Sequence, residues 1–198
     1  MIFIKNLNDW VYNLNNIIFM NSFYSEDELR SLGFIHVGEN VLLSKKTSIY
    51  SPDSITIGDN VRIDDFCILS GKISIGSNIH ISAYTSILGQ YGVKLEDYTG
   101  LSPRVTIYSA MDDFSGLYLI GPIHEKEYTN VVGGEVVIQK YAHVGANSII
   151  FPNLIVGSGV VVGACSLVKE SLEDWHIYAG VPAKKMKARS KDLLKFIK

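Results

Sequence analysis

A six-residue return of aliphatic side chains is the feature that most restricts how this chain can fold. Between residues 138 and 168 the period is unbroken, with aliphatic residues at Ile138, Val144, Ile150, Val156, Val162 and Val168. Neither a helix nor an ordinary strand repeats every six residues. Small residues follow several of the aliphatic ones, as in Val144-Gly145-Ala146. The pattern predicts a hexapeptide β-helix, in which each hexad forms one flat side and one corner.

The same period extends back through most of the chain. The earlier aliphatic positions are Val37, Leu43, Ile49, Ile57, Ile63, Leu69, Ile75, Ile81, Ile87, Leu95, Leu101 and Ile107. Two extra residues follow Ile49, two follow Ile87, and twenty-five residues beyond the six-residue period lie between Ile107 and Ile138. Because all three insertions come after the third hexad of a coil, they fall at one corner. We therefore predict an all-β parallel β-helix of about six coils, with residues 108–137 as a long protruding loop.

The two ends of the chain predict short helical segments that cap this β-helix. Ser25 to Glu28 forms a capping-box pattern and Gly33 is a typical helix stop, so we expect a helix over residues 26–32. Apolar residues at helical spacing between Leu7 and Ile18 predict an amphipathic helix, with contact to a membrane surface as the alternative. We expect three parts: a helical segment at 1–36, the β-helix at 37–170, and a tail with a short helix at 171–198.

Composition and charge exclude several classes of partner. The formal net charge is −2, and the basic residues gather only in the C-terminal tail, so no nucleic-acid partner is expected. No apolar run is long enough for a membrane span, and the N-terminus does not follow the pattern of a signal peptide. Cys67 and Cys165 lack the neighbours of a metal site. Buried reduced thiols in a cytoplasmic protein are the expectation.

The register of the hexads predicts one unusually polar side. Successive coils, about 4.8 Å apart, place these residues outward on it: Leu42, Arg62, His80, Gly100, His143 and Val161. The next corner carries Asp64, Ser82, Ser102, Gly145 and Gly163. Small residues leave the backbone accessible at the last two levels. A long, thin ligand could lie along this edge and bond to peptide groups.

Three segments together resemble a known family. The hexads, the segments at 144–152 and 162–168, and the closing sequence Gly180-Val-Pro-Ala-Lys-Lys are similar to the left-handed parallel β-helix acyltransferases that use coenzyme A thioesters. The resemblance implies a left-handed coil and a homotrimer with active sites between subunits. Residues 60–67 and 100–116 resemble the sugar branch, especially N-acyltransferases of nucleotide-linked amino-dideoxy sugars, with dTDP as the expected nucleotide.

One departure from that family bears on the reaction. O-acetyltransferases of the maltose and galactoside type have a catalytic His where this chain has Met111-Asp112-Asp113. A hydroxyl acceptor depends heavily on a general base, whereas a sugar amine is already partly neutral. We therefore expect N-acylation by an acetyl or other short acyl group, with Asp112 and Asp113 as candidate proton acceptors. A solvated turn at these aspartates, and O-acetylation of a polysaccharide or other hydroxyl, remain the alternatives.

Further candidates come from the polar side and its corner. We expect His80 to act as the base or to bind the acceptor, and Ser102 or a nearby backbone N–H to stabilise the oxyanion. Arg104 suits an acceptor phosphate, because its planar fork matches that geometry, and Tyr84 is a candidate contact with the acceptor. His143 is expected to face the thioester or a neighbouring chain. Ordinary surface roles remain open for each of them.

The resemblance also implies a track for coenzyme A along the last coils. The acyl-coenzyme A donor would meet the backbone near Ala146, Gly163, Ala164 and Ser166, and Lys184 and Arg189 would approach its phosphates. The alternative is that the basic tail only keeps the C-terminus hydrated.

Two other uses of a β-helix fit the sequence poorly. A carbonic anhydrase of the γ type needs three converging imidazoles, and His80 and His143 have no third histidine on a neighbouring coil. We expect no metal. A scaffold that binds ice would carry a ladder of threonines on one side, and the chain has none.

Overall fold

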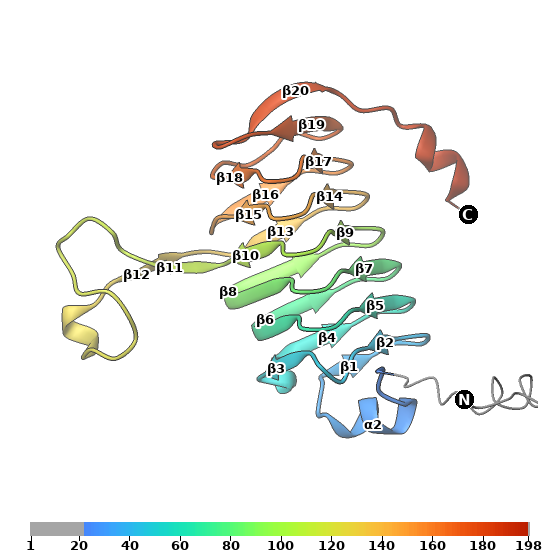
Figure 1. The fold of residues 1–198 in the computed structure, drawn as a ribbon, viewed down its shortest axis with the longest axis horizontal. Coiled ribbons are helices and arrows are strands. Elements are labelled where there is room, and N and C mark those ends of the chain that lie inside the picture. The colour runs from blue at the N-terminus through green and yellow to red at the C-terminus, as the bar shows by residue number, and fades with distance from the viewer. Residues whose placement is uncertain (1–21, 198) are drawn as a thin grey trace, which may run out of the picture.

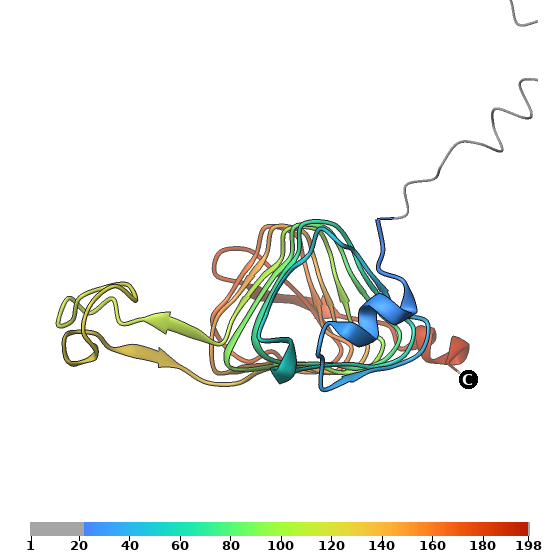
Figure 2. The ribbon, with the colours of Figure 1, turned by 90° about the horizontal axis from the view of Figure 1, so that it is seen from below.

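The computed structural model describes residues 22–197, so the helix expected between Leu7 and Ile18 lies outside the described residues. The chain winds into a stack of triangular coils (Figure 1). Viewed along the stack, three flat sides and three corners are visible (Figure 2). We call the sides one, two and three in the order in which the chain runs through each coil.

Side one is an eight-stranded sheet in which successive coils pair in parallel, apart from its last strand. Its strands are β2 (Leu42–Leu43), β5 (Val61–Ile63), β7 (Ile79–Ile81), β9 (Gly100–Leu101), β14 (His143–Val144), β17 (Val161–Val162), β19 (His176–Ala179) and β20 (Lys184–Ala188). The register pairs Arg62 with His80, His80 with Gly100, and Gly100 with His143. The predicted order of residues on the polar side is confirmed.

Sides two and three share a ten-stranded sheet. Side two holds β3 (Ser48–Tyr50), β10 (Thr106–Tyr108), β15 (Ile149–Ile150) and β18 (Leu167–Val168). Side three holds β1 (His36–Val37), β4 (Ile55–Ile57), β13 (Val136–Ile138) and β16 (Leu154–Val156). Two longer strands, β6 (Ile68–Ile75) and β8 (Ser86–Leu95), run continuously around the corner between them.

The aliphatic residues of the six-residue period form one core along the axis. All of the predicted inward positions are buried except Val37 and Ile49, which are partly buried in the first coil. Burying each such side chain contributes about 1.5–3 kcal/mol before the entropy of ordering it is subtracted. The predicted period and its inward direction are confirmed.

The three insertions all lie at the corner between sides two and three. The first forms η1 (Pro52–Ser54), the second lies in the bend of β8, and the third is the long excursion after β10. This excursion projects far from the body (Figure 1). Its base is an antiparallel pair, β11 (Ala110–Asp112) and β12 (Val131–Gly133), and its tip contains η2 (Lys126–Tyr128). The predicted loop is thus an arm with a two-stranded base.

Both ends of the described chain cover the stack. Helix α2 (Glu26–Ser31) begins at Ser25, and the predicted capping box with Glu28 is present. At the other end β20 turns back on β19 in antiparallel pairing, and η3 (Asp192–Phe196) follows. The basic tail therefore forms a strand before its short helix. Among the described residues, no helix has the length and apolar character to span a membrane.

Candidate active site

Asp64 connects two residues of the polar side. His80 Nε2 lies 2.7 Å from Asp64 Oδ2, and Arg62 Nε donates to Asp64 Oδ1 at 2.7 Å. Partial burial would raise the pKa of Asp64, but the hydrogen bonds from Arg62 and His80 outweigh it and lower that pKa. An ionised carboxylate thus orients His80. The spacing of the hexads places Asp64 at the corner but does not predict this role.

Ser102 and His143 form a second pair, two levels further along the stack. Ser102 Oγ lies 3.0 Å from His143 Nε2. The surrounding chain desolvates the imidazole and, with smaller contributions from the charges of Arg189 and His80, lowers the pKa of His143. The ring is therefore held in its neutral form near pH 7. The structure brings together two residues that sequence analysis treated separately.

An aromatic and cationic column follows the corner between sides one and two. The rings of Phe66 and Tyr84 stack with centroids 5.0 Å apart. The guanidinium of Arg104 lies 5.2 Å from the Tyr84 ring centroid, and Lys46 lies 5.4 Å from that of Phe66. Stacking on Tyr84 limits the motion of the Arg104 fork, so its N–H groups are held at the surface beside Ser102.

The same corner offers unpaired backbone donors at the expected coenzyme A track. Ala146 and Ala164 occupy equivalent positions on successive coils, and within residues 22–197 neither N–H has a hydrogen-bond partner. Both residues are partly or fully exposed. An unpaired, accessible N–H can bond to the amide carbonyl of a passing ligand.

Gly163 and Ser166 support this corner from within. Ser166 is 2% exposed, and its hydroxyl donates to Gly163 O at 2.7 Å and accepts from Gly180 N at 3.0 Å. Gly163 N donates to Tyr178 O at 2.7 Å. The polar groups of these two residues thus hold the coil together, and the accessible donors belong to Ala146 and Ala164.

The two cationic candidates of the tail differ in their surroundings. Lys184 is exposed on β20. Arg189 packs against side one, where its Nη1 donates to Tyr141 O at 2.8 Å and Gly159 O at 2.9 Å. Arg189 therefore ties the tail to two successive coils. Of these two candidates, Lys184 is the one that is open to a phosphate.

The two aspartates of the arm, Asp112 and Asp113, differ in what they contact. Asp113 Oδ1 accepts from Ser115 N at 2.8 Å, and Asp113 Oδ2 accepts from Asn130 Nδ2 at 2.8 Å. Hydrogen bonds from Ser115 and then from Asn130 lower the pKa of Asp113. Both oxygens of Asp113 thus serve the arm itself, whereas Asp112 lies at the end of β11, beside the groove described next.

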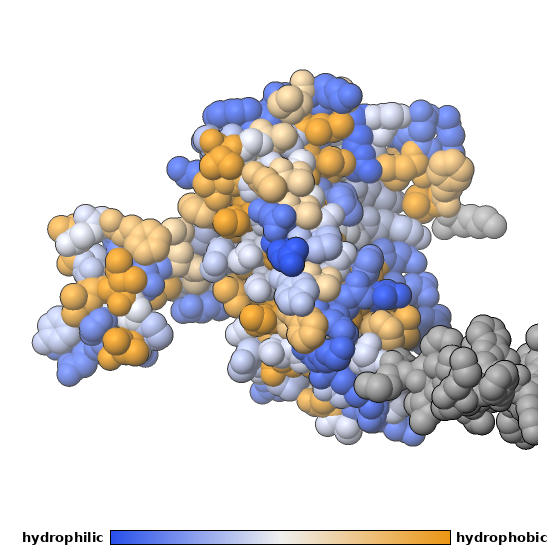
Figure 3. All heavy atoms as spheres, in the orientation of Figure 1, coloured by the Kyte–Doolittle hydropathy of each residue, from blue (hydrophilic) through white to orange (hydrophobic). Residues whose placement is uncertain are grey.

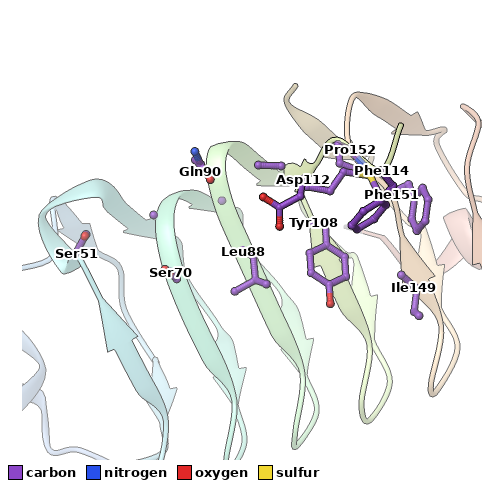
Figure 4. Close-up of a pocket in the computed structure, with 14 residues that line it drawn as sticks. Ser51, Ser70, Leu88, Gln90, Tyr108, Asp112, Phe114, Ile149, Phe151 and Pro152 are labelled. Atoms are coloured by element: carbon purple, nitrogen blue, oxygen red, sulfur yellow. The ribbon is translucent and has the colours of Figure 1, made fainter. Parts of the chain in front are cut away.

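A groove of about 740 Å³ lies between the arm and side two. Asp112, Phe114 and Tyr108 line it together with Leu88, Phe151 and Pro152 (Figure 4). Ser102 lies at the opposite end of side two, at its corner with side one, and His80 lies on side one. Within a single chain, therefore, the Asp112-Asp113 segment does not meet His80 and Ser102.

The two cysteines differ in exposure, and neither belongs to a metal-binding cluster among the described residues. Cys67 is buried and reduced as expected, but Cys165 is an exposed thiol at a corner where its φ is +57°. Within residues 22–197 no group of three or more His, Cys, Asp and Glu side chains is placed to hold a metal ion.

Comparison with known proteins gives close relatives. The chain is 45% identical over 176 residues to the dTDP-4-amino-4,6-dideoxy-D-glucose acyltransferase of Escherichia coli, covering 87% of this chain and 92% of that protein. The crystal structure of AntD, an N-acyltransferase from Bacillus cereus, in complex with dTDP and 3-hydroxybutyryl-CoA has 55% identity and a TM-score of 0.88. That match covers 89% of this chain and 95% of AntD.

A more distant structure supports the fold alone. A hexapeptide-repeat acetyltransferase from Vibrio cholerae is 18% identical, with a TM-score of 0.59 over 86% of this chain and 81% of that one. No family model matches the chain. Taken with the coil geometry, the unpaired corner donors and the arm, the close relatives show that this chain belongs to the left-handed parallel β-helix acyltransferases, in the branch of N-acyltransferases of nucleotide-linked amino-dideoxy sugars.

Proposed function

We propose that this enzyme transfers an acyl group from acyl-coenzyme A to the amino group of dTDP-4-amino-4,6-dideoxyglucose. The observation that carries the proposal is identity of 45–55% over nearly the whole chain with proteins that are named for, or bound to, these substrates. A solved AntD variant also holds dTDP-4-amino-4,6-dideoxyglucose and coenzyme A together. The free Cys67 and Cys165 favour a reducing compartment, and we place the enzyme in the cytoplasm.

The donor lies along the corner between sides one and two in this proposal. The unpaired N–H groups of Ala146 and Ala164 bond to the pantetheine carbonyls, since they lie on successive coils of one edge. Because Gly163 has no side chain, the edge between Ala146 and Ala164 stays narrow. Lys184 meets a phosphate, and Arg189 acts indirectly by fixing the tail that carries Lys184.

The acceptor lies further toward the N-terminal coils. Arg104 binds the diphosphate, because stacking on Tyr84 holds its fork in place. His80 is oriented by Asp64, and because its Nε2–H points at that carboxylate, its Nδ1 accepts a hydrogen bond from a sugar hydroxyl. The reacting amine is then placed near Ser102, between the acceptor and donor halves of the edge.

The reaction needs one proton acceptor and one oxyanion donor. The amine nitrogen attacks the thioester carbon, and the carbonyl oxygen becomes an oxyanion that accepts a hydrogen bond from the Ser102 hydroxyl. Asp112 takes the proton that the attacking amine loses. The C–S bond then breaks, the amide forms, and the coenzyme A thiolate recovers the proton.

The choice of Asp112 over Asp113 has independent support. Solved AntD structures include variants of one serine and one aspartate, at positions ten residues apart. Ser102 and Asp112 have the same separation. Ser54 and Asp64 share it as well, but Asp64 is already paired with Arg62 and His80.

A second copy of the chain must supply Asp112, because the arm leaves the corner opposite Ser102. The arm also exposes large apolar side chains, including Leu117 at 81% and Ile123 at 87%, that have no core of their own. Hydrophobic side chains gather on the arm in Figure 3. We propose a homotrimer, the assembly of the family, in which each arm reaches the Ser102 corner of its neighbour.

The test measures product directly. The purified enzyme is incubated with dTDP-4-amino-4,6-dideoxyglucose and either acetyl-coenzyme A or 3-hydroxybutyryl-coenzyme A, and the nucleotide sugar is examined by mass spectrometry. We expect a mass increase of one acyl group and release of one thiol. The matched control is dTDP-6-deoxyglucose, which offers a hydroxyl in place of the amine. Acylation of the control alone would overturn N-transfer in favour of O-transfer.

A further inference from the structure

Gly100 lies between two histidines on side one. The register places His80 on the preceding coil and His143 on the following coil, directly beside Gly100. A Cβ at position 100 would lie only 2.6 Å from His143 Nδ1 and 3.1 Å from His143 Cε1. Real Cβ atoms essentially never come as close as 2.6 Å to such an atom, so any side chain here would displace the ring. The imidazole of His143 thus lies over the backbone of Gly100.

The position of the His143 ring over Gly100 brings the ring into contact with Ser102. His143 belongs to β14, and Ser102 follows β9 on the coil before it. With the ring lying over Gly100, Nε2 comes within 3.0 Å of the Ser102 hydroxyl. His143 also borders a cavity of about 390 Å³, which Arg189 and the C-terminal segment line as well. Gly100 therefore makes the diagonal contact possible.

We propose that His143 is a positioning residue that fixes the direction of the Ser102 hydroxyl, and that Gly100 provides the space this requires. The inference rests on the proposed function in one respect, the role of Ser102 as oxyanion donor. A hydroxyl has one hydrogen and rotates freely about its C–O bond. When His143 Nε2–H donates to Ser102 Oγ, the Ser102 hydrogen is left to point toward the thioester oxygen.

The surroundings of the ring fit this use. The lowered pKa of His143 keeps the ring neutral, so no positive charge on the ring competes with the reacting amine. A chain of two hydrogen bonds, from Nε2–H to Oγ and from the hydroxyl to the oxyanion, also polarises in one direction as charge develops on the oxygen. The contact is therefore strongest in the transition state. Removing it should lower kcat and leave KM nearly unchanged.

A double-mutant cycle tests the proposal. Ser102→Ala, His143→Leu and the double variant are compared with the wild type in kcat and KM. We expect Ser102→Ala to lower kcat about 10²-fold, as for other oxyanion donors, and His143→Leu to lower it about tenfold. In the Ser102→Ala background, His143→Leu should cause no further loss. Equal losses in both backgrounds would overturn the positioning role and leave the proposed function intact, whereas an inert Ser102→Ala would refute the oxyanion assignment itself.

Three further variants separate positioning from simple stability. His143→Gln keeps a side-chain N–H donor and should recover most of kcat, whereas His143→Glu offers only acceptors at pH 7 and should recover none. Gly100→Ala should reproduce the kcat loss of His143→Leu without altering the imidazole. The matched control is His36→Leu, at an exposed histidine of β1 on side three, which should leave kcat unchanged. Equal activity of the Gln and Glu variants would contradict the donor role.

Discussion

The chemistry of single residues in this enzyme depends on what each side chain already contacts. Asp112 and Asp113 are neighbours in sequence, yet Asp113 holds Ser115 and Asn130 while Asp112 lies beside the open groove. His80 and His143 lie on one side, yet His80 is oriented by a carboxylate and His143 contacts a hydroxyl. The residue type alone therefore does not decide the role.

The two aspartates should respond differently to the same substitution. Asp112→Asn removes the proposed proton acceptor and should lower kcat at least tenfold, a typical contribution of general acid–base catalysis being about 10²–10⁴. Asp113→Asn should lower kcat less, because it removes only the hydrogen bonds within the arm. Steady-state kinetics of both variants, with coenzyme A binding measured by calorimetry as a control, decides between them. If Asp113→Asn lowered kcat more than Asp112→Asn did, Asp113 rather than Asp112 would be the proton acceptor.

The two cysteines should differ sharply in reactivity. Burial raises the pKa of the Cys67 thiol to about 11, and its side chain is 0% exposed, whereas Cys165 is exposed. Because the thiolate is the reactive form, iodoacetamide at pH 8 should label Cys165 and spare Cys67 in the folded protein. Mass spectrometry of the peptides measures this, and urea-unfolded protein should be labelled at both. Labelling of Cys67 in the native protein would count against the buried core at that corner.

Among the elements, the arm differs from the coils in what stabilises it. Each coil buries aliphatic residues in the common core, whereas the arm has a two-stranded base and exposes its large apolar residues. Isolated two-stranded ribbons are marginally stable in water. The polar contacts of Asp113, a local one with Ser115 and one across the arm with Asn130, thus matter more there than similar contacts would on a coil.

Acid should loosen the arm before it unfolds the coils. The folded-state pKa of Asp113 is lowered, so its stabilisation is complete above the unfolded value of about 4 and is lost as the pH falls through the folded value. Hydrogen exchange read by mass spectrometry should show lost protection at residues 110–133 below about pH 4, with the coil strands still protected. In Asp113→Asn the arm should exchange faster at neutral pH and should no longer depend on this titration. If the arm and the coils lost their protection from hydrogen exchange at the same pH, the prediction would be wrong.

The whole molecule is a rigid prism with one extended arm, and this shape separates the parts of the proposed active site. Side two lies between the Ser102 corner and the arm of the same chain. Exposed apolar residues on side two, including Tyr50 at 58% and Ile149 at 38%, add to those of the arm. A copy that packs on side two would cover both and would bring its arm to the Ser102 corner.

Shortening the arm should reduce both assembly and activity. Replacing residues 113–130 with Asn-Gly joins β11 to β12 by a two-residue hairpin turn, which their register allows. Sedimentation equilibrium should give a mass below three copies for this variant, and acyl transfer should fall at least tenfold while the circular dichroism of the coils is unchanged. A variant that retains the mass of three copies would show that side two suffices for assembly.

The sequence by itself determined the coil, because a period of six can be satisfied only by placing each aliphatic residue inside a three-sided turn. It also gave the order Arg62, His80, Gly100, His143 on side one, since parallel coils in register leave no other pairing. Donor and acceptor classes followed from the motifs that resemble the family.

Only the tertiary structure decided which of these side chains act together. The tilt of His143 over Gly100, the partners of Asp113 and the clamp formed by Arg189 depend on side-chain directions between levels of the stack, which spacing does not specify. The separation of Asp112 from Ser102 likewise follows from the rigid width of side two. The physical reason is that a periodic sequence fixes where each backbone position lies, whereas contacts between side chains depend on how each one packs against its own neighbours.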